Sequence, residues 1–123
     1  MEYHGATYRV GEKSCAATGL CRIQMKIAFV VHNEFFTDQV LELLAARGID
    51  YYTSWSNAKG KGHGTQPHLG RGSFPGVNSV LMIAFQEDGP LEDLIRGIDE
   101  ANAKIKRADD KIRLFQLPLE RMV

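Results

Sequence analysis

Basic side chains and glycines dominate the stretch of this 123-residue chain from residue 59 to residue 76. Its ionisable residues are all cations or histidines, namely Lys59, Lys61, His63, His68 and Arg71. Glycines at 60, 62, 64, 70, 72 and 76 leave backbone N–H groups open to close approach. Because cations and bare amides suit phosphate or carboxylate, the segment predicts an anion site. The same composition also fits a solvated loop whose charges bind nothing.

Metal binding has weaker support in the sequence. His63 and His68 lie on the glycine-rich stretch, where a hydrogen-bonding or solvated role is the simpler interpretation. Cys15 and Cys21 have no second cysteine cluster, so they do not complete a tetrahedral zinc site. We expect two free thiols in a reducing compartment, and no metal site.

Catalysis and nucleic-acid binding are not indicated. The chain has no GxxxxGK[ST] loop and no local signature of a nucleophile with its base, so we expect no enzyme. The formal net charge of +0 gives no basic surface for nucleic acid. Tyr51, Tyr52 and Trp55 are expected in the core or at an interface. Without a long apolar run or a secretory leader, the expected location is the cytoplasm.

Hydrophobic periodicity predicts four strands and two helices. Apolar, β-rich runs predict strands at 26–32, 77–86 and 112–118, and an aromatic, hydroxyl-rich run with β character predicts one at 49–58. Apolar steps of three and four predict helices at 37–47 and 89–105. The order βαββαβ is that of the α+β ferredoxin-like fold, a four-stranded antiparallel sheet with two helices on one face. A long loop joins the second and third strands. Residues 1–24 are expected to form an arm, and residues 25–123 the domain.

Two of the predicted strands are apolar on both faces. Val80, Met82 and Ala84 alternate with Leu81, Ile83 and Phe85, although a strand buried on one face only should alternate with polar residues. Two helices can cover a single face. The second face is therefore expected to pack against another copy of the chain.

With these elements placed, residues 25–123 resemble the PII-like superfamily of signalling proteins. The run Ala58-Lys59-Gly60-Lys61-Gly62, preceded by Thr53, is similar to the second strand entering the family's T-loop. Asp110-Lys111-Ile112 followed by Phe115 to Glu120 is similar to the family's last loop and strand. Pro67 to Val80 is closer to PII-like proteins that accompany transporters than to nitrogen regulators.

The resemblance implies a homotrimer that binds an adenine nucleotide, ADP or AMP, or a small anion such as bicarbonate in clefts between subunits. It implies a regulated partner, a membrane transporter, reached through the T-loop, and no obligatory cofactor. The ligand-binding residues that it implies are Thr53, Lys59, Gly60, Gly62, Asp110, Lys111 and Arg113. Lys111 and Arg113 are alternative positions for the family's phosphate-binding lysine.

Two departures separate the chain from nitrogen regulators. No tyrosine follows Tyr52, so the T-loop lacks the family's modifiable tyrosine. Asn78 replaces the lysine that holds 2-oxoglutarate. A trimeric CutA-type protein, which binds divalent metal and confers metal tolerance, shares the fold and remains the alternative, with His63, His68 and the cysteines as its ligands.

Overall fold

The computed structural model describes residues 24–61 and 77–123. In chain order these residues form the strands β1 (Met25–Asn33), β2 (Thr53–Ala58), β3 (Asn78–Phe85) and β4 (Arg113–Leu119), and the helices α2 (Thr37–Ala46) and α3 (Asp88–Lys104). Short 3-10 turns η2 (Glu34–Phe36) and η3 (Ala108–Asp110) precede α2 and β4. The arm predicted at residues 1–24 lies almost wholly outside the described residues.

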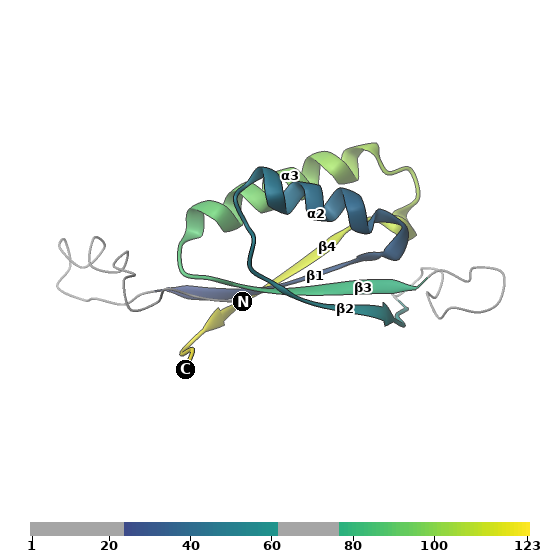
Figure 1. The fold of residues 1–123 in the computed structure, drawn as a ribbon. Helices are drawn as coiled ribbons and strands as arrows, with labels where there is room; N and C mark the ends of the chain where they lie inside the picture. The colour runs from purple at the N-terminus through teal and green to yellow at the C-terminus, as the bar shows by residue number, and fades with distance from the viewer. Residues whose placement is uncertain (1–23, 62–76) are drawn as a thin grey trace.

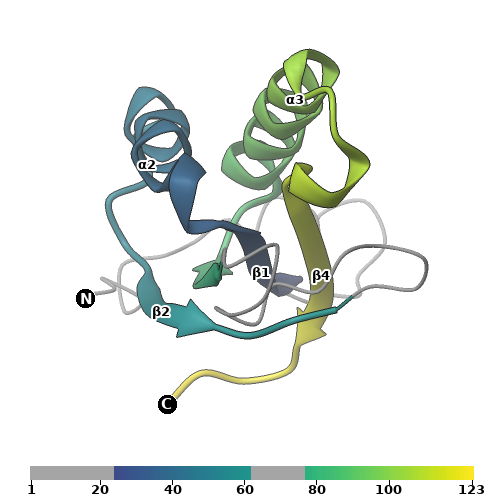
Figure 2. The same cartoon turned by 90° about the vertical axis from the view of Figure 1, so that its right-hand side faces the viewer.

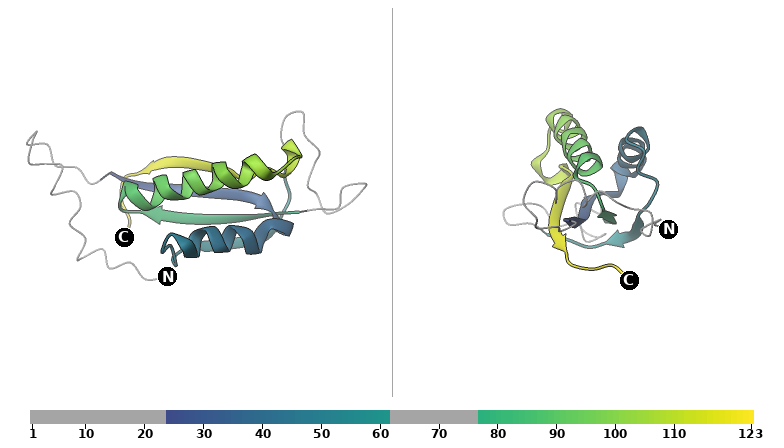
Figure 3. Two further views of the ribbon diagram at one scale, coloured as in Figure 1. Left: turned by 90° about the horizontal axis from the view of Figure 1, so that it is seen from above. Right: turned by 90° about the vertical axis from the view of Figure 1, so that its left-hand side faces the viewer.

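One antiparallel sheet carries the strands in the order β2-β3-β1-β4. Both helices lie on the same face of this sheet, and the opposite face is left open (Figure 1). The α+β ferredoxin-like fold expected from the periodicity is thus confirmed. Figure 3 shows α2 and α3 running side by side above the strands.

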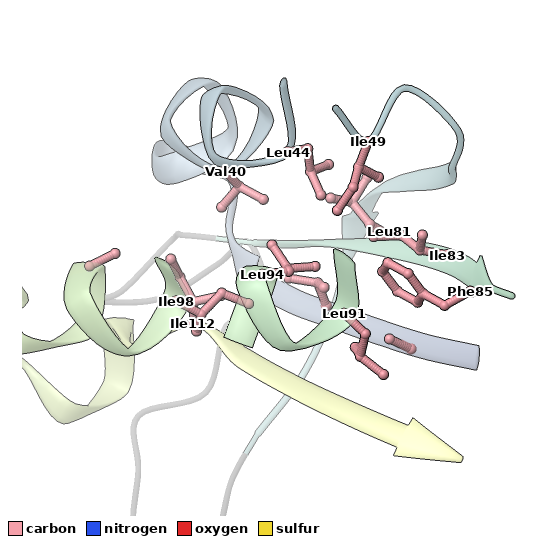
Figure 4. Close-up of a cluster of buried hydrophobic side chains, with 13 residues drawn as sticks. Val40, Leu44, Ile49, Leu81, Ile83, Phe85, Leu91, Leu94, Ile98 and Ile112 are labelled. Carbon is pink, nitrogen blue, oxygen red and sulfur yellow. The ribbon is translucent and has the colours of Figure 1, made fainter. Parts of the chain in front are cut away.

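The core lies between the helices and the sheet. Leu81, Ile83 and Phe85 of β3 point toward the helices and are nearly inaccessible to solvent. They meet Val40 and Leu44 of α2, and the α3 stripe of Leu91, Leu94 and Ile98 (Figure 4). Burial of such aliphatic side chains stabilises a fold by about 1.5–3 kcal/mol each, so this layer fixes the helices on the sheet.

Element boundaries differ from the predicted ones by a few residues. The second strand begins at Thr53 rather than residue 49, because Gly48 turns the chain with a φ of 72° and Ile49 then packs into the core. The second helix begins at Asp88, one residue before the predicted start, so Pro90 is its third residue. Pro118 lies inside β4, which an edge strand tolerates.

The first helix begins without a side-chain cap of its own. No side-chain hydrogen bond caps α2 at its start. Instead, the Asn33 side chain accepts a hydrogen bond from Phe35 N and begins η2 one turn earlier. This places Glu34 at the end of the sheet.

Candidate anion-binding site

One end of the sheet gathers most of the predicted ligand-binding residues. Ala58 at the end of β2 lies opposite Asn78, which lies opposite Asn33 at the end of β1. On the other side of β1, Arg113 at the start of β4 pairs with Val31. Figure 2 looks onto this end, with β2 and β4 at opposite edges of the sheet. The segments next to β2 and β4 therefore open onto the same end.

The loop before β4 combines acidic and basic side chains. Asp109 and Asp110 are largely shielded, with side-chain exposures of 18% and 21%. Arg107 Nη2 lies 3.6 Å from Asp109 Oδ2, and Arg107 Nε lies 3.9 Å from Asp110 Oδ2. Because the guanidinium offsets the two carboxylates, Lys111 can attract an anion that they would otherwise repel.

Asn102, in the last turn of α3, fixes the end of this loop. Its Oδ1 accepts a hydrogen bond from Ile112 N and its Nδ2 donates one to Ile112 O, both at 2.8 Å. Ile112 is buried and directly precedes β4. The side chain of Asn102 thus holds the backbone between Lys111 and Arg113, two candidate anion ligands.

The chain leaves β2 through a backbone conformation that needs support. Asn57 has a φ of 61°, in the left-handed region that asparagine adopts more readily than most residues. Its N–H donates to Glu34 Oε1 at 2.7 Å, and Ser79 Oγ donates to the same oxygen at 3.4 Å. Glu34 therefore helps to fix the backbone at Asn57, and with it the direction in which the chain continues to Lys59 and Gly60.

Gly60 allows a close approach to the sheet. A Cβ built at this position would lie 2.9 Å from Nδ2 of Asn78, closer than real Cβ atoms come. A larger residue at 60 would have to displace the Asn78 amide. Gly60 is thus suited to bringing the backbone after Lys59 against the first residue of β3.

His32 is a buried neighbour of these contacts. Burial lowers its pKa below 6.5, while a hydrogen bond with the Asn33 carbonyl and the charge of Glu34 act in the opposite direction. The imidazole is therefore neutral at pH 7, with its Nδ1 2.9 Å from Asn33 O. Since a carbonyl can only accept, Nδ1 carries the proton.

The structure separates the predicted site residues into three groups. Lys59 and Gly60 lie after β2, and Asp110, Lys111 and Arg113 lie around the start of β4. Thr53 lies at the other end of β2, opposite Met82 in the middle of β3, so its distance from Ala58 along the strand is about 16 Å. Gly62, like His63, His68, Cys15 and Cys21, lies outside the described residues.

Within one chain, the two groups of cations stand apart. β2 and β4 are the edge strands, separated by three strand spacings or about 14 Å. Lys59 and Arg113 are exposed and Lys111 is half-buried. In the part of the chain that the structure describes, none of these three side chains enters an ion pair.

Sequence reasoning missed the polar residues that organise this end. Asn33, Glu34 and Asn102 were not among the predicted site residues, although Asn33 contacts the Asp110 side chain and the other two hold backbone groups near Lys59 and Lys111. An asparagine directly after an apolar strand and before a helix is a signal for a cap, and it could have identified Asn33. Among residues 24–61 and 77–123, no three His, Cys, Asp or Glu side chains gather as metal ligands.

Comparisons by sequence find no match, neither to a family model nor to a curated protein. Comparison of structures finds CPII from Thiomonas intermedia K12, bound to ADP and bicarbonate. It is 16% identical with a TM-score of 0.57, over 81% of this chain and 95% of that one. A second CPII structure, bound to ADP, AMP and bicarbonate, is 14% identical with a TM-score of 0.55, over 80% of this chain and 96% of that one.

A third similar structure is a protein from Thermus thermophilus that is described as PII-like. It is 16% identical with a TM-score of 0.52, over 79% of this chain and 87% of that one. The chain therefore has the fold of the PII-like proteins, over almost the whole length of each. No described helix is long and apolar enough to span a membrane.

Proposed function

We propose that the chain is a PII-like regulatory protein that binds an adenine nucleotide, ADP or AMP, or a small anion such as bicarbonate. The observation that carries the proposal is the placement of Lys59, Lys111 and Arg113 at one end of a PII-like fold, without carboxylate partners in the described residues. The similar CPII structures contain ADP, AMP and bicarbonate. These ligands share an anionic group that such cations hold.

The ligand site lies between subunits of a homotrimer. Lys59 and Lys111 belong to opposite edges of the sheet in one chain, so the β2 edge of one copy meets the β4 edge of the next. Each cleft then receives Lys59 from one copy and Lys111 or Arg113 from its neighbour. Gly60 and Asp110 line the same cleft, and Gly62 continues the backbone beyond Gly60. Thr53 lies at the far end of β2, about 16 Å from Ala58, and does not reach this part of the cleft.

The loop between β2 and β3 carries the signal to a regulated partner, a membrane transporter. Ligand bound beside Lys59 changes how this loop leaves the sheet, and the partner recognises the change. The protein acts in the cytoplasm, without catalysis and without an obligatory cofactor. The protein responds to its ligand by a change in the contacts of this loop. The ligand drives the change because it binds one of two loop arrangements more tightly than the other.

Single cation replacements test the site. A cation in a cleft that partly excludes water gives a charged hydrogen bond of about 1.5–3 kcal/mol. Lys59→Ala, Lys111→Ala or Arg113→Ala should therefore weaken binding by about 10- to 100-fold. The measurement is calorimetry of the full chain with ADP, AMP, ATP and bicarbonate. All three variants should keep the melting temperature of the unliganded parent, because none of the cations belongs to the core.

Arg96→Gln is the matched control. Arg96 is an exposed cation on α3, paired only with Asp93 in the preceding turn, and such surface pairs are worth about 0–1 kcal/mol. The Arg96→Gln protein should bind the ligand with the same affinity as the parent. Titration with copper and zinc forms the second arm. Metal binding without nucleotide or bicarbonate binding would replace this proposal with the CutA-type alternative.

A further inference from the structure

Two consecutive residues at the end of β1 contact both groups of candidate ligand residues. Asn33 Nδ2 donates to Asp110 Oδ1 at 3.4 Å, in the loop that carries Lys111. Glu34 Oε1 accepts from Asn57 N at 2.7 Å, two residues before Lys59. The contacts span 77 and 23 positions of sequence, yet a single peptide unit separates the two side chains that make them.

The peptide that joins Asn33 to Glu34 has little freedom to move. β1 is an inner strand that pairs with β3 and β4 on its two sides. Glu34 N donates to Val77 O at 2.9 Å, and Asn33 Oδ1 accepts from Phe35 N at 2.9 Å. Because the backbone and Asn33 Oδ1 are held, Asn33 Nδ2 and the neighbouring Glu34 side chain keep a defined position relative to each other, so a force on Asn33 Nδ2 is passed on to Glu34.

Each contact holds a segment in a defined position. The charged hydrogen bond from Asn57 to Glu34 supports a left-handed backbone at residue 57, and such bonds are shorter and stronger than neutral ones. The contact from Asn33 to Asp110 complements the ion pair of Asp110 with Arg107. An anion that approaches Lys111 repels the Asp110 carboxylate, and the force reaches Asn33 through this contact.

We propose that Asn33 and Glu34 are positioning residues that couple the loop before β4 to the base of the loop after β2. This coupling rests on the proposed function, in which an anionic ligand binds beside Lys111. It makes the direction of the chain at Asn57 depend on whether Lys111 holds an anion. A ligand at the β4 edge of a chain is thereby sensed at the β2 edge of the same chain.

Hydrogen exchange without ligand tests the coupling independently of any ligand. Asn33→Asp keeps an oxygen for Phe35 N but puts a second carboxylate against Asp110 in place of the donor. Exchange of the Asn57 amide, measured by NMR on the full chain, should become faster by about tenfold, equivalent to about 1.4 kcal/mol. Asp109→Asn is the matched control, because among the described residues Asp109 pairs with Arg107 and not with Asn33, and it should leave this amide at the parent rate.

A swap of donor and acceptor separates coupling from general loss of structure. In the double variant Asn33→Asp with Asp110→Asn, the amide lies on residue 110 and the carboxylate on residue 33, so the contact forms in reverse. Slow exchange at Asn57 should return to within about threefold of the parent, or about 0.7 kcal/mol. The proposal is overturned if Asn33→Asp exchanges like the parent, or if the double variant exchanges as fast as Asn33→Asp.

ADP supplies the second arm, with Glu34→Gln and Glu34→Ala as variants. ADP should change the rate of exchange at Asn57 in the parent, change it less in Glu34→Gln, and leave it unchanged in Glu34→Ala, while calorimetry shows that ADP still binds all three. If ADP changes exchange at Asn57 equally in Glu34→Ala and the parent, coupling does not pass through Glu34 and the proposal is overturned. If neither ADP nor bicarbonate binds the parent, the proposed function fails, and the swap in the unliganded chain decides the coupling alone.

Discussion

Asn102 shows how a single amide can hold a loop end. Ile112 has a buried backbone N–H and C=O at the point where the chain leaves η3 and enters β4, so neither group can reach water freely. The Asn102 side chain matches them with a donor and an acceptor, each at 2.8 Å. A buried backbone group without a partner costs about 1–3 kcal/mol, which gives this residue a large effect on stability.

We expect Asn102→Ala to lower the free energy of unfolding by about 2–4 kcal/mol, because both backbone groups of Ile112 lose their partner. Asn102→Asp keeps the acceptor for Ile112 N and should cost less. Urea unfolding followed by circular dichroism measures both. Glu100→Ala, an exposed change on the same helix, should stay within about 0.5 kcal/mol of the parent. An Asn102→Ala protein as stable as the parent would show that the hydrogen bonds between Asn102 and the Ile112 backbone do not stabilise the fold.

At single positions, sequence named candidate cations but not the residues that organise this end of the sheet. Lys59, Lys111 and Arg113 could be named as candidates because their charge is a property of the residue itself and the family resemblance points to their positions. Asn33, Glu34 and Asn102 act through geometry, since each contacts a group that only the folded chain brings near: the Asp110 side chain, Asn57 N and the Ile112 backbone. Which carbonyl or amide an asparagine faces depends on strand register, and one sequence does not specify it.

Arg47 joins α2 to α3. From the turn after α2, its Nε donates to Asp93 O at 2.7 Å and its Nη1 donates to Leu43 O at 3.0 Å. The guanidinium lies directly over Gly97, where a Cβ would overlap it. Glycine inside a helix costs about 1 kcal/mol relative to alanine, so the close helix approach at Gly97 offsets an intrinsic loss.

A double-mutant cycle tests this arrangement. Gly97→Ala should destabilise the parent by about 1–2 kcal/mol, because the displaced guanidinium loses hydrogen bonds of a charged donor. In an Arg47→Ala background, the same change should stabilise the protein by about 0.5–1 kcal/mol, because the guanidinium is gone and alanine has a higher helix propensity than glycine. Thermal unfolding of the four proteins measures the cycle. If Gly97→Ala changed the free energy of unfolding in the same direction in both backgrounds, Arg47 and Gly97 would be independent.

Elements were easier to predict than their ends. Apolar periodicity identified both helices and the strands β1, β3 and β4, because burial imposes that pattern on the sequence, whereas the exposed β2 was identified from its aromatic and hydroxyl-rich composition. The ends depend on local contacts. Ile49 begins an aromatic, hydroxyl-rich run that suggests strand, yet the turn at Gly48 directs it into the helix-facing core instead. Tertiary packing, rather than residue preference, decided that boundary.

The sheet presents its second apolar face to solvent in the single chain. Trp55, Phe115 and Leu117 are 48%, 56% and 50% exposed, and they lie on the two edge strands. Strand register places Phe115 opposite Phe29, and Phe29 opposite Met82, on the face away from the helices. Large exposed aromatic and aliphatic side chains at this density are typical of a surface that another protein copy covers.

We expect the chain to form a homotrimer in solution through this open face, and a charge on the face to disrupt it. Light scattering at micromolar concentration should give three times the chain mass of 13.7 kDa. Leu117→Lys should give a monomer, because a buried ammonium without a partner is costly. Gln116→Lys is the matched control: the neighbouring residue pairs with Ala28 on the helix-facing side, is itself exposed, and should remain trimeric. A monomeric parent would exclude the shared clefts that the proposed anion site requires, whereas a trimeric Leu117→Lys protein would place the contact between copies on another surface.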